Sequence, residues 1–222
     1  MTNFERLIEQ GHAAVAVGRF SIGIRDYDHA YRIAVGYKEQ ASALQNKGIA
    51  LRLANDLLGS ESALQGARAI AVATEDFELV GRIERDIGMT ILDRATMTED
   101  RGQFADAEMW FDESWKKLKV IKPLEAAMTI GFIGRSFFCR GERSDAIALL
   151  VIAHKALTGR HDVYELNNLI WLARASVFYR WRFAPRFLHL VSQTGHTRRN
   201  KEYLVLLVGG NRLYKFLRER RR

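Results

Sequence analysis

The stretch Gly102-Gln103-Phe104-Ala105-Asp106-Ala107 places an aromatic residue two positions and a small residue five positions after a glycine. A similar order returns along the chain at intervals of about 40 residues. A glycine between two apolar helical patterns is typical of a tight turn between helices. We therefore predict a repeated helix–turn–helix unit. The related segments are Gly18-Arg19-Phe20…Gly23, Gly59-Ser60…Ala63, Gly141-Glu142…Ala146 and the more divergent Trp181-Arg182-Phe183.

Apolar residues recur at the helical period through most of the chain. In the first segment they place Phe4, Leu7, Ile8, Gly11 and Val15 on one helix face. No segment shows the strict alternation of a strand, and two prolines in 222 residues leave long helices uninterrupted. The sequence thus predicts an all-α protein. After the first helix, the expected helices cover about residues 21–35, 38–55, 60–72, 77–97, 104–120, 124–139, 143–157, 163–179 and 185–193.

These helices are expected to pair as about five antiparallel hairpins in an α-solenoid. The predicted repeat domain covers residues 1–196, and no proline-rich or Gly/Ser-rich linker divides it. Residues 197–222 are expected to form a basic capping helix and tail, because the end of a solenoid leaves apolar surface to be covered. The predicted units span about residues 4–36, 38–73, 77–120, 124–158 and 163–194.

Small and large residues follow a common order within the units. They are Gly11, Gly18, Phe20, Gly23, Tyr27 and Ala30 in the first, Ala95, Gly102, Phe104, Ala107 and Phe111 in the third, and Gly134, Gly141, Ala146, Leu150 and Ala153 in the fourth. The second has Ala63, Ala67 and Ile70, and the fifth keeps Phe183 and Leu190. The pattern resembles the tetratricopeptide repeat (TPR), in which small residues let two helices approach. The period is longer than the ~34 residues of that family.

The resemblance implies a non-enzymatic adaptor that binds a peptide or protein segment in a concave groove lined by the first helix of each hairpin. Arginines there would bind a peptide carboxylate or an acidic side chain, and asparagines would hold an extended backbone. The groove candidates on this basis are Gln45, Arg52, Asn55, Met89, Asp93, Thr96, Met128, Arg135, Asn168, Trp171 and Phe178. A regulatory part of a larger enzyme or secretion complex fits the same pattern.

Positive charge is concentrated at the C-terminal end. Residues 180–222 contain twelve Lys/Arg and two Asp/Glu, whereas the rest contains 22 basic and 24 acidic residues. Arginines alternate with aromatic residues from Arg174 to Phe187, and this combination binds phosphates and stacks bases. RNA or another polyanion is therefore the alternative ligand. Its candidate residues are Arg180, Arg182, Arg186, Arg198, Arg199, Lys201, Arg212 and Lys215.

The expected helix at residues 201–222 is both apolar and basic. We expect it to cap the last hairpin, although a basic amphipathic helix also binds anionic membrane surfaces. An acidic protein segment is the expected partner, and a membrane surface is not.

The sequence contains no pattern typical of catalysis or of cofactor binding. None of the six histidines belongs to a metal-ligand motif, and nucleotide-binding and nucleophile-elbow motifs are missing. The single cysteine, Cys139, lies in an apolar stretch and is expected to be a buried, inert thiol. We therefore expect no enzyme activity, no metal and no cofactor. The N-terminus has no signal-peptide pattern, so a cytoplasmic location is expected.

Overall fold

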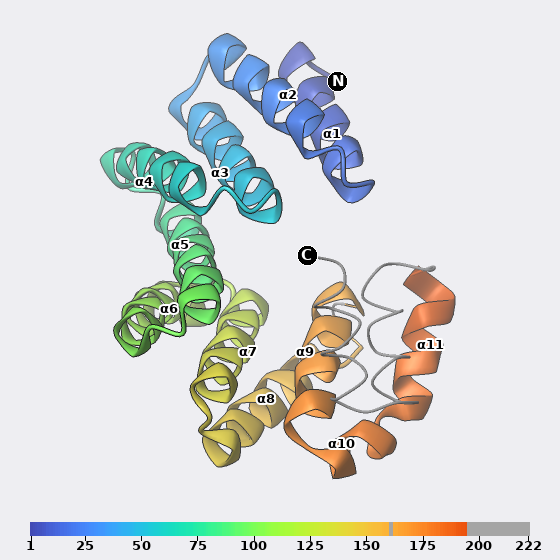
Figure 1. The fold of residues 1–222 in the computed structure, drawn as a ribbon. Helices are drawn as coiled ribbons and strands as arrows, with labels where there is room; N and C mark the ends of the chain where they lie inside the picture. The colour runs from blue at the N-terminus through green and yellow to red at the C-terminus, as the bar shows by residue number, and fades with distance from the viewer. Residues whose placement is uncertain (160–161, 195–222) are drawn as a thin grey trace. The chain divides into compact units, whose positions relative to one another are not determined.

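The computed structural model describes residues 1–159 and 162–194, and this part of the chain is helical throughout (Figure 1). Consecutive helices pack as hairpins, which confirms the all-α prediction. The helices are α1 (Asn3–Ala16), α2 (Phe20–Ile33), α3 (Tyr37–Leu53), α4 (Leu57–Ala73), α5 (Phe77–Thr98), α6 (Arg101–Ile121), α7 (Pro123–Arg140), α8 (Arg143–Leu157), α9 (Asp162–Ala175), α10 (Val177–Arg182) and α11 (Ala184–Thr194).

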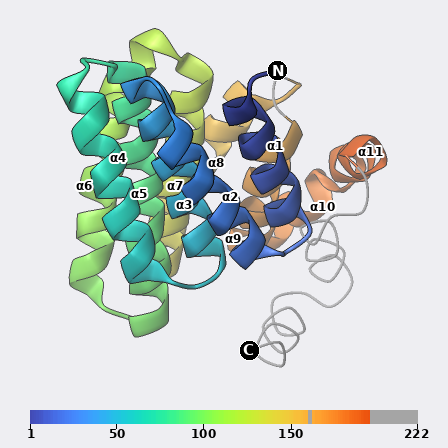
Figure 2. The ribbon, with the colours of Figure 1, turned by 90° about the horizontal axis from the view of Figure 1, so that it is seen from above.

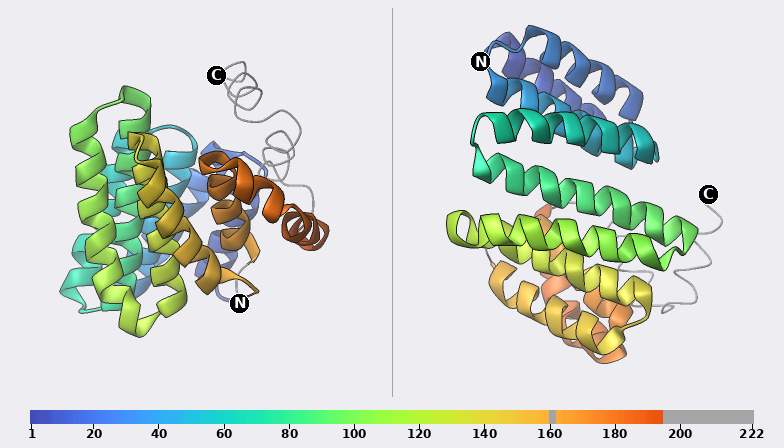
Figure 3. Two further views of the ribbon diagram at one scale, coloured as in Figure 1. Left: turned by 90° about the horizontal axis from the view of Figure 1, so that it is seen from below. Right: turned by 90° about the vertical axis from the view of Figure 1, so that its left-hand side faces the viewer.

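The chain forms two compact units, which we call unit 1 (residues 1–123) and unit 2 (residues 124 onward). In unit 1 the hairpins α1–α2, α3–α4 and α5–α6 follow one another as successive layers (Figures 2 and 3). In unit 2, α7 and α8 form the next hairpin, and α10 and α11 both pack against α9. The boundary at Pro123 therefore lies between the third and fourth predicted repeats. The division predicted at residue 196 lies outside the described residues.

Each of the first four hairpins is closed by a glycine of its first helix that meets a large side chain of its second. A Cβ atom added at Gly88 would lie 2.7 Å from the Phe111 ring and 3.1 Å from the Ala107 carbonyl oxygen. The backbones therefore approach too closely to admit even a methyl group. The four pairs are Gly11–Tyr27, Gly48–Leu64, Gly88–Phe111 and Gly134–Leu150.

Several of these helices begin at a residue whose side chain caps the helix N-terminus. In α1 the Thr2 hydroxyl accepts from the Glu5 amide, while the Glu5 carboxylate accepts from the Thr2 amide at 2.7 Å. Aspartates perform the same role in unit 1 at α4, α5 and α6, where Asp56, Asp76 and Asp100 each accept from an amide of the first turn. The Leu79 amide, helped by Lys38, holds the pKa of Asp76 below its usual range against the opposing effect of burial.

The predicted turn glycines are correct at two of four positions. Gly18 and Gly141 have φ values of 79° and 95°, which glycine adopts without steric strain. Gly59 and Gly102 instead lie inside the first turns of α4 and α6, so their assignment as turn residues was wrong. The left-handed residues in those two hairpins are Asn55 and Glu99.

This displacement explains why the residues predicted for the second repeat differ from those in the structure. In the second repeat the small and large residues that follow the turn residue Asn55 are Ser60, Leu64 and Ala67. They lie 5, 9 and 12 positions after Asn55, as Gly23, Tyr27 and Ala30 lie after Gly18 in the first repeat. All three residues of the second repeat are fully buried, whereas the predicted Ala63 is only partly buried. The predicted register was therefore shifted by three residues.

The third hairpin is longer than its neighbours. Gly88 lies eleven residues before its turn residue Glu99, whereas Gly48 lies seven before Asn55. The extension adds a second glycine contact, Gly81 against Leu118. The residue opposite Phe111 is consequently Gly88 and not the predicted Ala95, which is buried nearer the turn. The longer helices account for the irregular period.

The helix predicted at residues 163–179 is broken. Ser176 has an extended backbone, which ends α9 at Ala175 and starts α10. The break lets the following residues fold back, so that Phe183 lies against His154 with ring centroids 4.3 Å apart. The second arm of the fifth hairpin is therefore two helices. The predicted capping helix at 201–222 lies outside the described residues.

Candidate functional site

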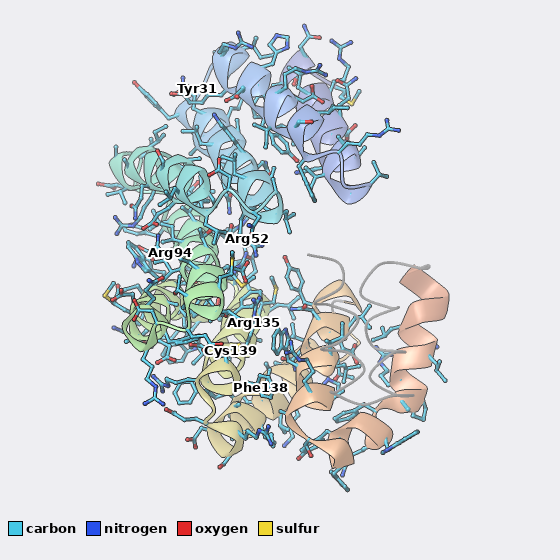
Figure 4. All side chains as sticks on the ribbon, viewed as in Figure 1. Tyr31, Arg52, Arg94, Arg135, Phe138 and Cys139 are labelled. Carbon is cyan, nitrogen blue, oxygen red and sulfur yellow. The ribbon has the colours of Figure 1, made fainter. Side chains whose placement is uncertain are left out.

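Two stripes of side chains face each other across α7 and α9 in unit 2. Because these are the first helices of successive hairpins, they run in the same direction, and residues three and four apart share a face. Figure 4 shows Arg135 and Phe138 on the side of α7 toward α9. We call this surface the α7–α9 wall. It consists of Met128, Gly131, Phe132, Arg135 and Phe138 from α7 and of Tyr164, Asn167, Asn168, Trp171 and Arg174 from α9.

A cluster of cations and aromatic rings forms one end of the wall. The guanidinium groups of Arg135 and Arg174 lie 4.9 Å and 4.2 Å from the centroid of the Trp171 ring. The Phe138 ring meets the same indole edge-on at 5.7 Å. Cation–π contacts of this kind hold a guanidinium in place while leaving it charged. The cluster therefore presents two positive charges with little side-chain freedom.

A small pocket forms the other end of the wall, bounded by Met128, Phe132 and Tyr164. Asn168 lies in its lining and is only 4% exposed. Its amide nitrogen donates to the Leu150 carbonyl at 2.7 Å, which turns Oδ1 toward Gly131. That oxygen is buried and accepts no hydrogen bond from the residues that the structure describes. A buried acceptor without a donor costs about 1–3 kcal/mol, so this position favours a ligand that supplies an N–H group.

Gly131 lies directly against this buried acceptor. A Cβ atom at Gly131 would lie 3.0 Å from Asn168 Oδ1, at the limit of what a carbon–oxygen contact allows. A residue larger than glycine at this position would therefore press on the Asn168 oxygen.

The structure brings four of the predicted groove residues together on this wall, namely Met128, Arg135, Asn168 and Trp171. Phe178 lies elsewhere, on α10, where 63% of its surface is exposed. Four further residues of the wall were not among the predicted groove residues, namely Phe132, Tyr164, Asn167 and Arg174. Their helical spacing from the chosen residues was the signal that would have found them, because 164, 167, 168, 171 and 174 follow one face.

Three of the six predicted groove residues of unit 1, namely Gln45, Arg52 and Asp93, form side-chain contacts between α3 and α5. The Gln45 amide donates to Asp86 at 2.7 Å in a buried contact between α3 and α5. Seven residues further along both helices, about two turns, Arg52 pairs with Asp93 at 2.8 Å. We call these two contacts the α3–α5 seam. Arg52, which the resemblance assigned to a ligand carboxylate, thus already binds a carboxylate of its own chain.

The remaining unit 1 candidates have other environments. Met89 is buried, and the Thr96 hydroxyl donates to the Leu92 carbonyl of its own helix. Asn55 is exposed in the α3–α4 turn. A third polar contact joins α4 to α5, where Arg94 reaches Glu61 at 2.6 Å. Arg52 and Arg94 are both labelled in Figure 4.

A buried ion pair holds α11 against α9. Glu165 is fully buried, and Arg186 donates to its two oxygens at 2.8 and 2.7 Å. Burial raises the pKa of Glu165, but the hydrogen bonds from Arg186 and the Gly159 amide outweigh it and leave the pKa lowered. In the neighbouring His154, burial disfavours the charged imidazolium and lowers the pKa.

This ion pair bears on the polyanion alternative. Arg186 is engaged by Glu165, whereas Arg182 is exposed, with its guanidinium 5.7 Å from the Phe178 ring. No side-chain position is described for Arg180. Arg198, Arg199, Lys201, Arg212 and Lys215 lie outside the described residues.

Two further properties of the described residues bear on other functions. Within residues 1–159 and 162–194, no group of three His, Cys, Asp or Glu side chains is arranged to hold a metal ion. No helix in the same ranges combines the length and hydropathy of a bilayer span. Cys139 is a free thiol, partly buried against the core of unit 2.

Solved structures with the same architecture cover most of the chain. The crystal structure of BtubC (BKLC) from P. vanneervenii matches with a TM-score of 0.65 and 11% identity, over 87% of this chain and 82% of that one. A putative kinesin light chain with nearly identical TPR-like repeats, from Podosopora anserina, matches with a TM-score of 0.57 and 13% identity, over 92% and 96% of the two chains. The chain has a TPR-like fold. A variant of that putative kinesin light chain matches at 0.55 and 17%, over 87% and 94%.

No family model matches the sequence, and no curated protein matches it. At these identities the structural matches establish the fold alone. The TPR-like hairpin persists because it depends on a few small and large positions, which a distant sequence can retain while the rest changes.

Proposed function

We propose that this TPR-like protein is a non-enzymatic scaffold that binds an extended, acidic segment of a partner protein along the α7–α9 wall. The observation that carries the proposal is the stack of Arg135 and Arg174 on Trp171. Guanidinium groups bind carboxylates through charge-assisted, often bidentate hydrogen bonds. Because the indole already restricts both arginines, less conformational entropy is lost when a carboxylate binds.

The pocket end of the wall supports the same ligand. Asn168 offers a buried acceptor for a backbone N–H group, and Met128 and Phe132 offer apolar contact for a small side chain. Gly131 and Phe138 are seven residues apart on α7, a rise of about 10 Å. An extended peptide covers this distance in about three residues. The preferred segment thus carries an apolar residue followed or preceded, about three positions away, by Asp or Glu.

The test uses the full chain and fluorescent peptides of this pattern, measured by anisotropy. Each acidic peptide is paired with an otherwise identical one containing Asn or Gln. We expect the acidic peptide to bind more tightly, and Arg135→Ala or Arg174→Ala to weaken its binding about tenfold or more, as loss of a charge-assisted contact predicts.

Arg25→Ala is the matched control, because Arg25 is an exposed arginine of unit 1 beside Asp26. Its affinity should equal that of the unsubstituted chain. Equal binding of the acidic and the amide peptides would refute the proposal, as would binding of RNA in place of either peptide.

A further inference from the structure

The arm formed by α10 and α11 is apolar on two opposite sides. Its inner side packs against the rest of unit 2, where Leu190 is fully buried and Tyr179 stacks on Phe183 with ring centroids 5.7 Å apart. Its outer side exposes 63% of Phe178 and 62% of Trp181. Large aromatic side chains grouped on an exposed helix face are typical of an interaction surface. The outer side is therefore a surface that needs a partner.

The exposed aromatic residues form a compact group with one cation. Phe178, Trp181 and Arg182 are three and four positions apart on α10, so they share a helix face. We call these three residues the outer patch. The Arg182 guanidinium lies 5.7 Å from the Phe178 ring, and Leu188 of α11 is a further exposed apolar residue nearby in sequence.

The outer patch is held facing outward by contacts on the opposite side of the arm. Arg186 binds the buried Glu165 with two hydrogen bonds, and Phe183 lies against His154. These contacts use the inner side of the arm. Rotation that buried Phe178 and Trp181 would therefore break an ion pair whose acid is fully buried, which is strongly unfavourable.

Charge restricts what can cover the patch. The α10–α11 arm, residues 177–194, contains three arginines and no acidic residue, so a second copy of the same surface would be repelled. An anionic partner is attracted. An anionic surface into which aromatic side chains can insert satisfies both properties of the patch, because Trp and Phe partition into the membrane interface while Arg binds headgroups.

We propose that the outer patch docks the protein on an anionic lipid surface, with Trp181 and Phe178 inserted between headgroups and Arg182 among the phosphates. Single-stranded nucleic acid fits the patch less well. Base stacking needs a free ring face, whereas Arg182 lies over Phe178 and Tyr179 meets that ring at 5.2 Å. This site is separate from the α7–α9 wall, so either proposal can fail alone.

The test is sedimentation of the full chain with vesicles of phosphatidylcholine, with and without phosphatidylserine. We expect binding to the phosphatidylserine vesicles only, with partial release at high salt. Phe178→Ser and Trp181→Ser should each weaken binding about tenfold, the effect of withdrawing one large apolar side chain from the interface. The control is Val120→Ser, which removes an exposed apolar residue from unit 1.

Brominated lipids supply a second measurement. They should quench fluorescence of the unsubstituted chain more than that of Trp181→Phe, which keeps an aromatic residue and should bind within about twofold. Circular dichroism checks that all variants remain helical. Unchanged binding of Phe178→Ser and Trp181→Ser would overturn the proposal, and so would retention of an RNA oligonucleotide without retention on vesicles.

Discussion

The α3–α5 seam of unit 1 and the α7–α9 wall of unit 2 are built from the same kind of contact, between the first helices of successive hairpins. In the seam, Arg52 is neutralised by Asp93, and Gln45 bonds Asp86. In the wall, Arg135 and Arg174 lie on Trp171. The seam joins two helices through an arginine matched by a carboxylate, whereas the wall holds two arginines on an aromatic ring. On the function proposed above, one repeat geometry serves cohesion in unit 1 and recognition in unit 2.

The largest expected effect comes from the hairpin contact that underlies both regions. Gly88→Val should lower the free energy of unfolding by about 3 kcal/mol, because its side chain must displace Phe111 or separate α5 from α6. Denaturant unfolding followed by circular dichroism measures the change.

Gly66→Ala is the control for that substitution, since a Cβ atom there would meet only Leu44 at an ordinary 3.6 Å. It should change stability by no more than about 1 kcal/mol, and in the favourable direction, because alanine is the better helix former. Similar losses at Gly66 and Gly88 would contradict the close approach of the two helices.

Removing an arginine should affect mainly stability in the seam and mainly peptide binding in the wall. Arg52→Ala should lower the free energy of unfolding by about 1–3 kcal/mol, because it removes the partly buried ion pair between Arg52 and Asp93. Binding of the acidic peptide should not change. Arg135→Ala should give the opposite pattern, a large loss of peptide affinity with a smaller loss of stability. If Arg52→Ala weakened binding as strongly as Arg135→Ala, the distinction between cohesion and recognition would be lost.

Acid should loosen the contact between α11 and α9 in two stages. The pKa values of His154 and Glu165 are both lower in the folded protein, so their stabilisation is complete above the unfolded values and declines as the pH falls. The first stage should begin below about pH 6.5 with His154, and the second below about pH 4.3 with Glu165. Hydrogen exchange of α11 amides measures both.

Glu165→Gln isolates the second stage. The variant should expose α11 at neutral pH and retain no transition below about pH 4.3. Protection of α11 in the unsubstituted chain that stays constant from about pH 5 to about pH 2 would exclude the proposed role of the ion pair.

The smallest effect is expected at the pocket end of the wall. Gly131→Ala should weaken peptide binding by a few-fold, because the new methyl group would press on Asn168 Oδ1. Stability should change by less than about 1 kcal/mol, as the helix propensity of alanine offsets the tight contact. A peptide whose backbone N–H opposite Asn168 is methylated should bind Gly131→Ala and the unsubstituted chain equally. If the two proteins still differed in affinity for this peptide, Asn168 would not bind the peptide backbone.

Much of the fold could be predicted from the sequence, because hairpin packing leaves a local signature. Tyr27, Phe111 and Leu150 each follow a small residue by four positions, and all three lie in second helices as expected. The fifth hairpin was recognisable from Phe183 and Leu190, although its break at Ser176 was not. The residues around Ser176 do not by themselves specify an extended backbone there. The break is stabilised by contacts that form only after α10 and α11 fold back on unit 2.

The candidate site was predicted less completely. Arg135 and Trp171 were selected, but so were Arg52 and Asp93, and nothing local distinguishes the two arginines. Arg52 and Asp93 are 41 positions apart, as are Gln45 and Asp86. Pairings at such separations depend on how successive hairpins stack, which the helical period alone does not specify.

The sequence by itself determined the all-α hairpins, because small and large residues at fixed spacings allow only helices that approach closely. It also determined the basic C-terminal end, because charge is a property of composition. The tertiary structure decided which residue adopts the left-handed turn, how far the third hairpin extends, and which arginines meet carboxylates or aromatic rings. Each of these depends on contacts between residues far apart in the chain, whose free energies appear only when the hairpins pack.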